Sequence, residues 1–130
     1  MKDSYLADTH TFLWSAIDPT KLSAKVKKLL IDKEVQIYLS VASLWEISIK
    51  RSTGKLTLPT TTREFVTRAA AGIALEVLPI TAAVAIEVEY LPPFHSDPFD
   101  RLLVAQAKLL SINILSSDKH FDSYDVIRVW

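Results

Sequence analysis

The sequence predicts an α/β protein: a single-domain α/β/α sandwich in which helices cover both faces of a mainly parallel, Rossmann-like sheet. The chain has 130 residues, the size of one domain, so residues 1–130 are expected to form a single unit. Hydrophobic residues make up 49% of the chain and glycine is rare, which is typical of an ordered globular core. Strand patterns alternate with helix patterns throughout, and this alternation favours a parallel sheet with crossover helices.

The first half of the chain predicts two strands, each followed by helical sequence. Alternating, β-branched apolar residues indicate the strands, and apolar residues three to four positions apart indicate the helices. Ser23 is a suitable N-cap, Pro19 stops the helix before it, and Gly54 marks a helix end. The expected elements are a strand at 5–7, a helix from 9 that ends before Pro19, a helix at 23–32, a strand at 35–39 and a helix at 41–52.

The second half continues the alternation. Thr81 can cap one helix, and the two prolines at 92 and 93 force a loop after it. Asp97 can cap the next helix, with Pro98 in its first turn, where a missing N–H costs nothing. The expected elements are a helix from 62, a strand at 75–78, a helix at 81–90, a helix at 97–110, a strand at 112–115, a helical turn at 119–121 and a strand at 126–129.

Composition excludes several classes of function. Lysine plus arginine and aspartate plus glutamate number 15 each, so net charge gives no general attraction to nucleic acid. There is no cysteine, which excludes disulfides, thiolate metal ligands and a cysteine nucleophile. The N-terminus lacks the apolar run of a signal peptide, and no segment approaches the length of a membrane span. We therefore expect a cytoplasmic protein with no membrane association.

Asp100 stands out within the helix expected at 97–110. It shares a helical face with Leu103, Val104 and Ala107, which should pack inward. A carboxylate on such a face is costly unless it is paired, hydrogen-bonded or bound to a metal. The simpler alternative is an acidic capping pair with Asp97, favoured by the helix dipole.

Four acidic residues occupy matching places in the predicted fold. Asp8 and Asp118 follow the first and fourth strands, Glu46 lies in the helix after the second strand, and Asp100 lies in the helix before the fourth. Since parallel strands share one carboxyl edge, all four can converge there. Four carboxylates raise one another's pKa unless a cation holds them, and oxygen ligands favour Mg²⁺ or Mn²⁺. Such a centre suits phosphodiester hydrolysis.

Each acid also has a simpler interpretation. Asp8 and Asp118 can cap the helical turns that follow them, and Glu46 can pair with Lys50 on a helix surface, a contact worth only about 0.3–0.5 kcal/mol. Recurrence of acids at strand ends favours a common site over four separate accidents.

The sequence blocks around these acids resemble PIN-domain ribonucleases, of the VapC type found in toxin–antitoxin pairs. The resemblance covers nearly the whole chain in the same order. It rests on the blocks Leu-Ala-Asp-Thr-His-Thr at 6–11, Ser-Leu-Trp-Glu-Ile-Ser-Ile-Lys at 43–50 with Gly-Lys-Leu at 54–56, Asp-Pro-Phe-Asp-Arg-Leu-Leu-Val-Ala-Gln-Ala at 97–107, and Ser-Asp at 117–118 followed by Phe121 and Tyr124.

The resemblance implies a PIN fold and a metal-dependent endoribonuclease that uses Mg²⁺ or Mn²⁺. It implies an RNA substrate, inhibition by a cognate antitoxin, and a homodimer. The family's metal-binding, catalytic acids map to Asp8, Glu46, Asp100 and Asp118. Supporting positions next to them are Asp97, Ser117 and Thr9.

Two other classes of function were weighed. A phosphatase or phosphotransfer domain also places acids at strand ends, but the second aspartate expected two residues after Asp8 is absent, and Leu39-Ser40 supplies no phospho-accepting aspartate. A non-catalytic PIN-like module, whose acids only bind an antitoxin or RNA, remains the main alternative.

The remaining polar residues point less clearly to chemistry. The three histidines, His10, His95 and His120, lack the paired spacing of a zinc motif, although His10 and His120 each follow a proposed acid by two residues. Lys50 and Arg51 can contact phosphate or form a solvated helix end, and Arg101 can orient a carboxylate or hold phosphate. The tryptophans at 14, 45 and 130 are expected in the core.

Overall fold

The computed structural model describes residues 3–130 and contains one five-stranded sheet. Every strand pairing is parallel, and the strand order is β3-β2-β1-β4-β5. The strands are β1 (Asp3–Ala7), β2 (Val35–Ser40), β3 (Leu75–Leu78), β4 (Asn113–Leu115) and β5 (Arg128–Val129). The predicted parallel sheet is confirmed.

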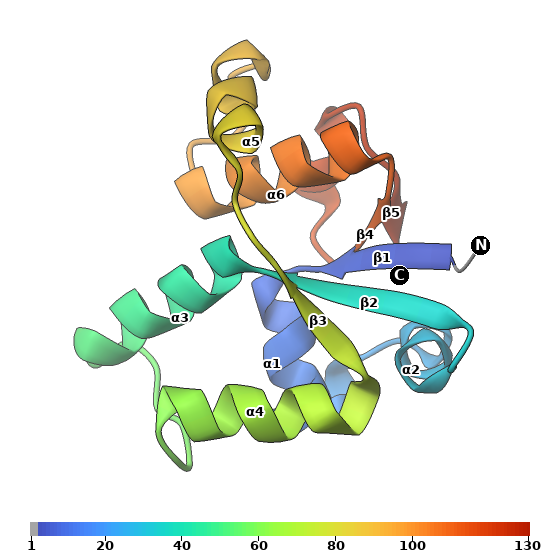
Figure 1. The fold of residues 1–130 in the computed structure, drawn as a ribbon, viewed down its shortest axis with the longest axis vertical. Helices are drawn as coiled ribbons and strands as arrows, with labels where there is room; N and C mark the ends of the chain where they lie inside the picture. The colour runs from blue at the N-terminus through green and yellow to red at the C-terminus, as the bar shows by residue number, and fades with distance from the viewer. Residues whose placement is uncertain (1–2) are drawn as a thin grey trace.

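Helices cover both faces of this sheet, so the molecule has the three predicted layers (Figure 1). The α-helices are α1 (Thr9–Ile17), α2 (Ala24–Ile31), α3 (Val41–Ser52), α4 (Thr62–Ile73), α5 (Ala82–Glu87) and α6 (Pro98–Leu110). Short 3₁₀ turns are η1 (Pro19–Lys21), η2 (Val88–Tyr90) and η3 (Lys119–Ser123). Helices α1, α2 and α4 lie on one side of the sheet, and α5 and α6 lie on the other (Figure 1).

The central strand β1 divides the core in two because its side chains alternate between the faces. Leu6 is fully buried and belongs to the cluster that contains Leu103 and Ile114, on the α6 side. Ala7 belongs to the opposite cluster, with Phe12 and Leu39. Burying one leucine side chain such as Leu6 contributes roughly 2 kcal/mol to the free energy of folding. Because β1 buries side chains on both faces of the sheet, both core clusters stabilise this strand.

Several predicted elements differ from the observed ones: β1 begins at Asp3 rather than at residue 5, and η3 extends to Ser123 rather than ending at residue 121. The helix expected at 81–90 ends as α-helix at Glu87 and continues as the 3₁₀ turn η2, because Pro92 disfavours helix before it and the Arg101 guanidinium takes the Val88 carbonyl at 3.0 Å. The last strand is only Arg128–Val129, because its partner β4 offers only three residues for pairing.

Trp45 corrects the prediction that all three tryptophans lie in the core. Its side chain is 56% exposed and packs edge-on against Phe99, with ring centroids 5.3 Å apart. Helix α3 turns Ser43, Glu46 and Ile47 inward, and Trp45 therefore lies on the outward face of the helix. Trp14 and Trp130 are half-buried against the core cluster that contains Ala7, Phe12 and Leu39.

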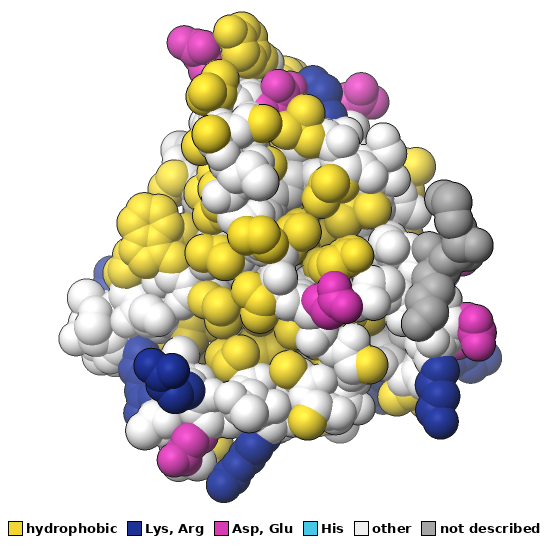
Figure 2. Space-filling model, viewed as in Figure 1, with side chains coloured by type: hydrophobic (Ala, Val, Ile, Leu, Met, Phe, Trp, Pro, Cys, Tyr) yellow, Lys and Arg dark blue, Asp and Glu magenta, His cyan; other side chains and the backbone are white. Residues whose placement is uncertain are grey.

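Apolar side chains also gather on the face of the molecule that Figure 2 shows, over β3 and α5. Val77 on the edge strand β3 and Ile86 on α5 are 44% and 60% exposed. Within residues 3–130, no helix has both the length and the apolar composition needed to cross a bilayer.

Candidate metal centre

Asp8 lies directly after β1, at the carboxyl end of the sheet, and its side chain is buried. One carboxylate oxygen accepts the Thr11 N–H at 2.8 Å, so Asp8 is the N-cap of α1, as its simpler interpretation predicts. The other oxygen accepts the Ser116 hydroxyl at 2.5 Å. Both partners are neutral donors, so these contacts orient the carboxylate and leave its charge uncompensated.

Ser116 connects Asp8 to Asp118. Its hydroxyl oxygen accepts the Asp118 N–H at 3.0 Å while it donates to Asp8, and the residue is fully buried. The supporting hydroxyl was expected at Ser117, but Ser117 is exposed. Successive side chains of an extended chain point to opposite sides, so Ser117 turns outward when Ser116 turns inward. The sequence alone does not show which of the two adjacent serines supports the site.

Glu46 projects from α3 and is also buried, with 5% of its surface exposed. Its Oε1 accepts the Thr9 hydroxyl at 2.7 Å, and Thr9 Oγ1 lies 2.9 Å from Ser43 Oγ. Lys50 Nζ lies 2.7 Å from Glu46 Oε2. The predicted i,i+4 pair therefore exists, but its carboxylate faces the interior and only Lys50 reaches solvent.

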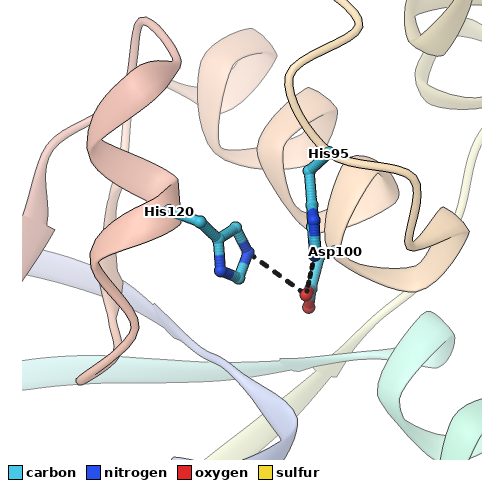
Figure 3. A group of neighbouring side chains, drawn as sticks. All are labelled: His95, Asp100 and His120. Atoms are coloured by element: carbon cyan, nitrogen blue, oxygen red, sulfur yellow. Dashed lines mark hydrogen bonds and ion pairs between the residues drawn. The ribbon is translucent and has the colours of Figure 1, made fainter.

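Asp100 lies in the first turn of α6. Its Oδ2 is 3.2 Å from His95 Nε2 and 3.2 Å from His120 Nε2 (Figure 3). Burial, together with the negative charges of Asp97, Glu46 and Asp8, raises the pKa of Asp100 to about 6, and the charge of His120 acts in the opposite direction. These charges place Asp100, Asp97, Glu46 and Asp8 in one electrostatic neighbourhood.

Asp97 is the N-cap of α6, and it accepts the N–H groups of Phe99 at 2.8 Å and Asp100 at 3.2 Å. The capping interpretation is therefore correct for Asp97. It does not extend to Asp100, whose carboxylate points to the two histidines.

Asp118 is the N-cap of η3 and remains largely exposed. Its Oδ1 accepts the His120 N–H at 3.2 Å and lies 2.6 Å from His120 Nδ1. Burial acts to raise the pKa of Asp118, but these hydrogen bonds and the charges of His120 and His95 hold it below its ordinary value. His120 thus links Asp118 to Asp100.

The other polar residues singled out in the sequence make structural contacts instead of contacts with the four acids, except for His95. His10 stacks on Trp14, with ring centroids 5.7 Å apart. Arg51 donates to the Thr62 hydroxyl at 3.2 Å. Arg101 donates to the backbone carbonyls of Val88 and Pro92 rather than to a carboxylate, so it fixes the loop before α6. His95 contacts Asp100 from that loop, and nothing in the local sequence predicts this contact.

The structure therefore brings Asp8, Glu46, Asp100 and Asp118 to the carboxyl end of the sheet, between α3 and α6. Burial is the largest cause of the raised pKa of Asp100, and the neighbouring carboxylates add to it. Carboxylate oxygens are the donors that Mg²⁺ and Mn²⁺ prefer, but within residues 3–130 the ligand atoms that lie within 4.8 Å of one another are those of His95, Asp100 and His120. Fold and site together define a parallel α/β protein with a cation-attracting acidic centre.

The chain belongs to the PIN domain family, whose sequence profile matches residues 5–127. No curated protein matches it in sequence.

Several solved structures share the fold. A chain of VapBC2 from Rickettsia felis, bound to a promoter DNA fragment, has a TM-score of 0.73 at 16% identity, with 97% of each chain covered. A chain of DNA-bound VapBC from Salmonella typhimurium has a TM-score of 0.67 at 16% identity, covering 100% of this chain and 98% of that one. A chain of FitAcB from Neisseria gonorrhoeae has a TM-score of 0.64 at 19% identity, covering 97% and 96%.

Proposed function

We propose that the protein is a metal-dependent endoribonuclease that acts as the toxin of a toxin–antitoxin pair. The observation that carries this proposal is that Asp8, Glu46 and Asp100 interact electrostatically at one end of the sheet, while His120 links Asp118 to Asp100. Burial and neighbouring carboxylates raise the pKa of Asp100 to about 6. A protein maintains such repulsion when a bound cation relieves it, and structural likeness to VapBC and FitAB toxin–antitoxin complexes supports the toxin role.

In this proposal the metal ligands are Asp8, Glu46, Asp100 and Asp118, and the ion is Mg²⁺, with Mn²⁺ as an alternative. When bound, such an ion neutralises charge on the scissile phosphate and lowers the pKa of the attacking water. Ser116 and the Thr11 N–H orient Asp8, and Thr9 orients Glu46. Asp97 fixes the first turn of α6 and thereby holds Asp100 toward the site.

A basic cavity beside the acids supports RNA as the substrate. Its volume is about 290 Å³, and its lining includes Thr9, His10, Trp14, Lys21, Lys50 and Lys55. Lysines neutralise backbone phosphates, and aromatic rings can stack on unpaired bases. Lys50 also contacts Glu46, so phosphate bound by this lysine would lie next to the acidic centre.

The protein partners follow from the same proposal. An antitoxin would cover the acidic centre, as the resemblance to VapC-type proteins implies. The exposed apolar face over β3 and α5 supports a homodimer, since apolar area of this kind is typical of protein interfaces (Figure 2). Both partners and the RNA would be met in the cytoplasm.

Cleavage of a mixed RNA pool by antitoxin-free protein tests the proposal. The assay compares Mg²⁺, Mn²⁺ and EDTA, and includes Asp100→Asn. Asp125→Asn is the matched control, because Asp125 is exposed and the change in charge is identical. We expect metal-dependent cleavage by the wild type and the control, and none by Asp100→Asn. If Asp100→Asn cleaved as fast as the wild type, or the wild type were inert, the non-catalytic interaction module would be the better account.

A further inference from the structure

Three side chains at the edge of the acidic centre form a second kind of site. His95 comes from the loop before α6, Asp100 from the first turn of α6, and His120 from η3 (Figure 3). One ligand atom from each lies within 4.8 Å of the other two. All three are partly buried, so the group is held in place yet accessible to solvent.

The spacing of these atoms matches a metal polyhedron. Asp100 Oδ2 lies 3.2 Å from the Nε2 atoms of both His95 and His120. Ligand atoms bound to Zn²⁺ at 2.0–2.2 Å in tetrahedral geometry lie about 3.3 Å from one another. An ion can therefore be placed among the three atoms with little movement of the side chains.

The hydrogen bonding of His120 leaves the correct nitrogen available. Its Nδ1 lies 2.6 Å from Asp118 Oδ1, so Asp118 fixes the orientation of the ring. The Nε2 atom faces Asp100 Oδ2 at 3.2 Å and is buried without a hydrogen-bond partner, so a bound cation can replace its proton. A carboxylate that holds one ring nitrogen while the other binds metal is the usual arrangement of metal-binding histidines.

We propose that His95, Asp100 and His120 bind a borderline divalent transition metal of the Zn²⁺ class. Two imidazoles and one carboxylate are a donor set of open zinc sites, whereas Mg²⁺ prefers oxygen ligands. The nearby carboxylates of Asp8, Glu46 and Asp97 add negative potential that favours any cation.

One consequence of this site rests on the proposed nuclease function. Both sites use Asp100, so Zn²⁺ bound to the two histidines withdraws that carboxylate from the all-oxygen Mg²⁺ centre. Zn²⁺ is then expected to inhibit Mg²⁺-dependent RNA cleavage by competition for one shared ligand.

Metal binding by the tag-free chain tests the site. Zn²⁺ is titrated by calorimetry, and Co²⁺ is titrated by visible spectroscopy, in wild type, His95→Gln and His120→Gln. His10→Gln is the matched control, because the chain has three histidines and His10 stacks on Trp14 instead of joining the cluster. We expect one equivalent of Zn²⁺, and the strong visible bands of low-coordinate Co²⁺, in wild type and His10→Gln. Affinity should fall at least tenfold in both cluster variants.

Equal Zn²⁺ affinity in wild type and His95→Gln would overturn the site. His95 lies in a loop, so circular dichroism is expected to show that this variant is folded, and its result decides the matter even if His120→Gln is unstable. RNA cleavage with Mg²⁺ alone is measured separately. A chain that binds Zn²⁺ but cleaves no RNA would contradict the nuclease proposal and support the histidine site. A chain that cleaves RNA with Mg²⁺ but binds no Zn²⁺ would contradict the histidine site and support the nuclease proposal.

Discussion

Replacing Asp100 with asparagine is expected to stabilise the metal-free protein at neutral pH. Asparagine keeps the size of the side chain and removes its charge. The pKa of Asp100 rises from 3.8 to about 6 because of burial and the neighbouring carboxylates of Asp97, Glu46 and Asp8. Each pKa unit corresponds to about 1.4 kcal/mol, so ionised Asp100 costs the folded state up to about 3 kcal/mol.

The sign of this effect depends on pH. Because the folded pKa is raised, the contribution of Asp100 to stability is fully present below about pH 4 and is lost as the pH rises through about 6. The advantage of Asp100→Asn should therefore approach about 3 kcal/mol at pH 7.5 and fall below about 1 kcal/mol at pH 4.

Urea unfolding, followed by tryptophan fluorescence in EDTA at both pH values, measures the difference. Asp125→Asn is the charge-matched control and should show no pH-dependent gain, since its side chain is exposed. The reasoning is refuted if Asp100→Asn is less stable than wild type at pH 7.5, or if its advantage is the same at both pH values.

Three further results are expected. Ser116→Ala should lower the free energy of unfolding by about 1–3 kcal/mol and reduce RNA cleavage, because it removes the buried hydroxyl between Asp8 and Asp118. The control Ser117→Ala, at an exposed position, should stay within about 0.5 kcal/mol of wild type in urea unfolding. Mg²⁺ should raise the melting temperature of wild type but not of Asp100→Asn, since the ion relieves repulsion that the variant lacks; an equal rise in both would contradict the shared site. In a catalytically inactive background, the double variant Lys21→Ala/Lys55→Ala should bind RNA more weakly. The slope of log affinity against log salt concentration should fall by the equivalent of up to about 2 phosphate contacts. An unchanged slope would exclude the basic cavity as the RNA-binding surface.

The layers of the fold follow from patterns within short stretches of sequence. Alternating strands and helices required parallel pairing, and the helix caps at Ser23, Thr81 and Asp97 needed only the residue and its local backbone. Asp8 and Asp118 could be placed at the sheet edge for the same reason, because Asp8 directly follows β1 and Asp118 lies three residues after the end of β4.

The finer features of the site depend on contacts between distant segments. Local sequence could not distinguish Ser116 from Ser117, because the choice depends on which side of β4 faces Asp8. His95 reaches Asp100 because Arg101 binds the Val88 carbonyl of η2 and the Pro92 carbonyl of the loop before α6. The exposed position of Trp45 depends on which face of α3 the core takes.

The location of Mn²⁺ in crystals of the antitoxin-free protein tests the central claim most directly. Mn²⁺ replaces Mg²⁺ on oxygen ligands, and its anomalous scattering identifies its position. We predict a peak within coordination distance, about 2.0–2.4 Å, of carboxylate oxygens from the set Asp8, Glu46, Asp100 and Asp118. A peak bound elsewhere, or no peak at the carboxyl end of the sheet at saturating Mn²⁺, would contradict the claim that these acids form the metal centre.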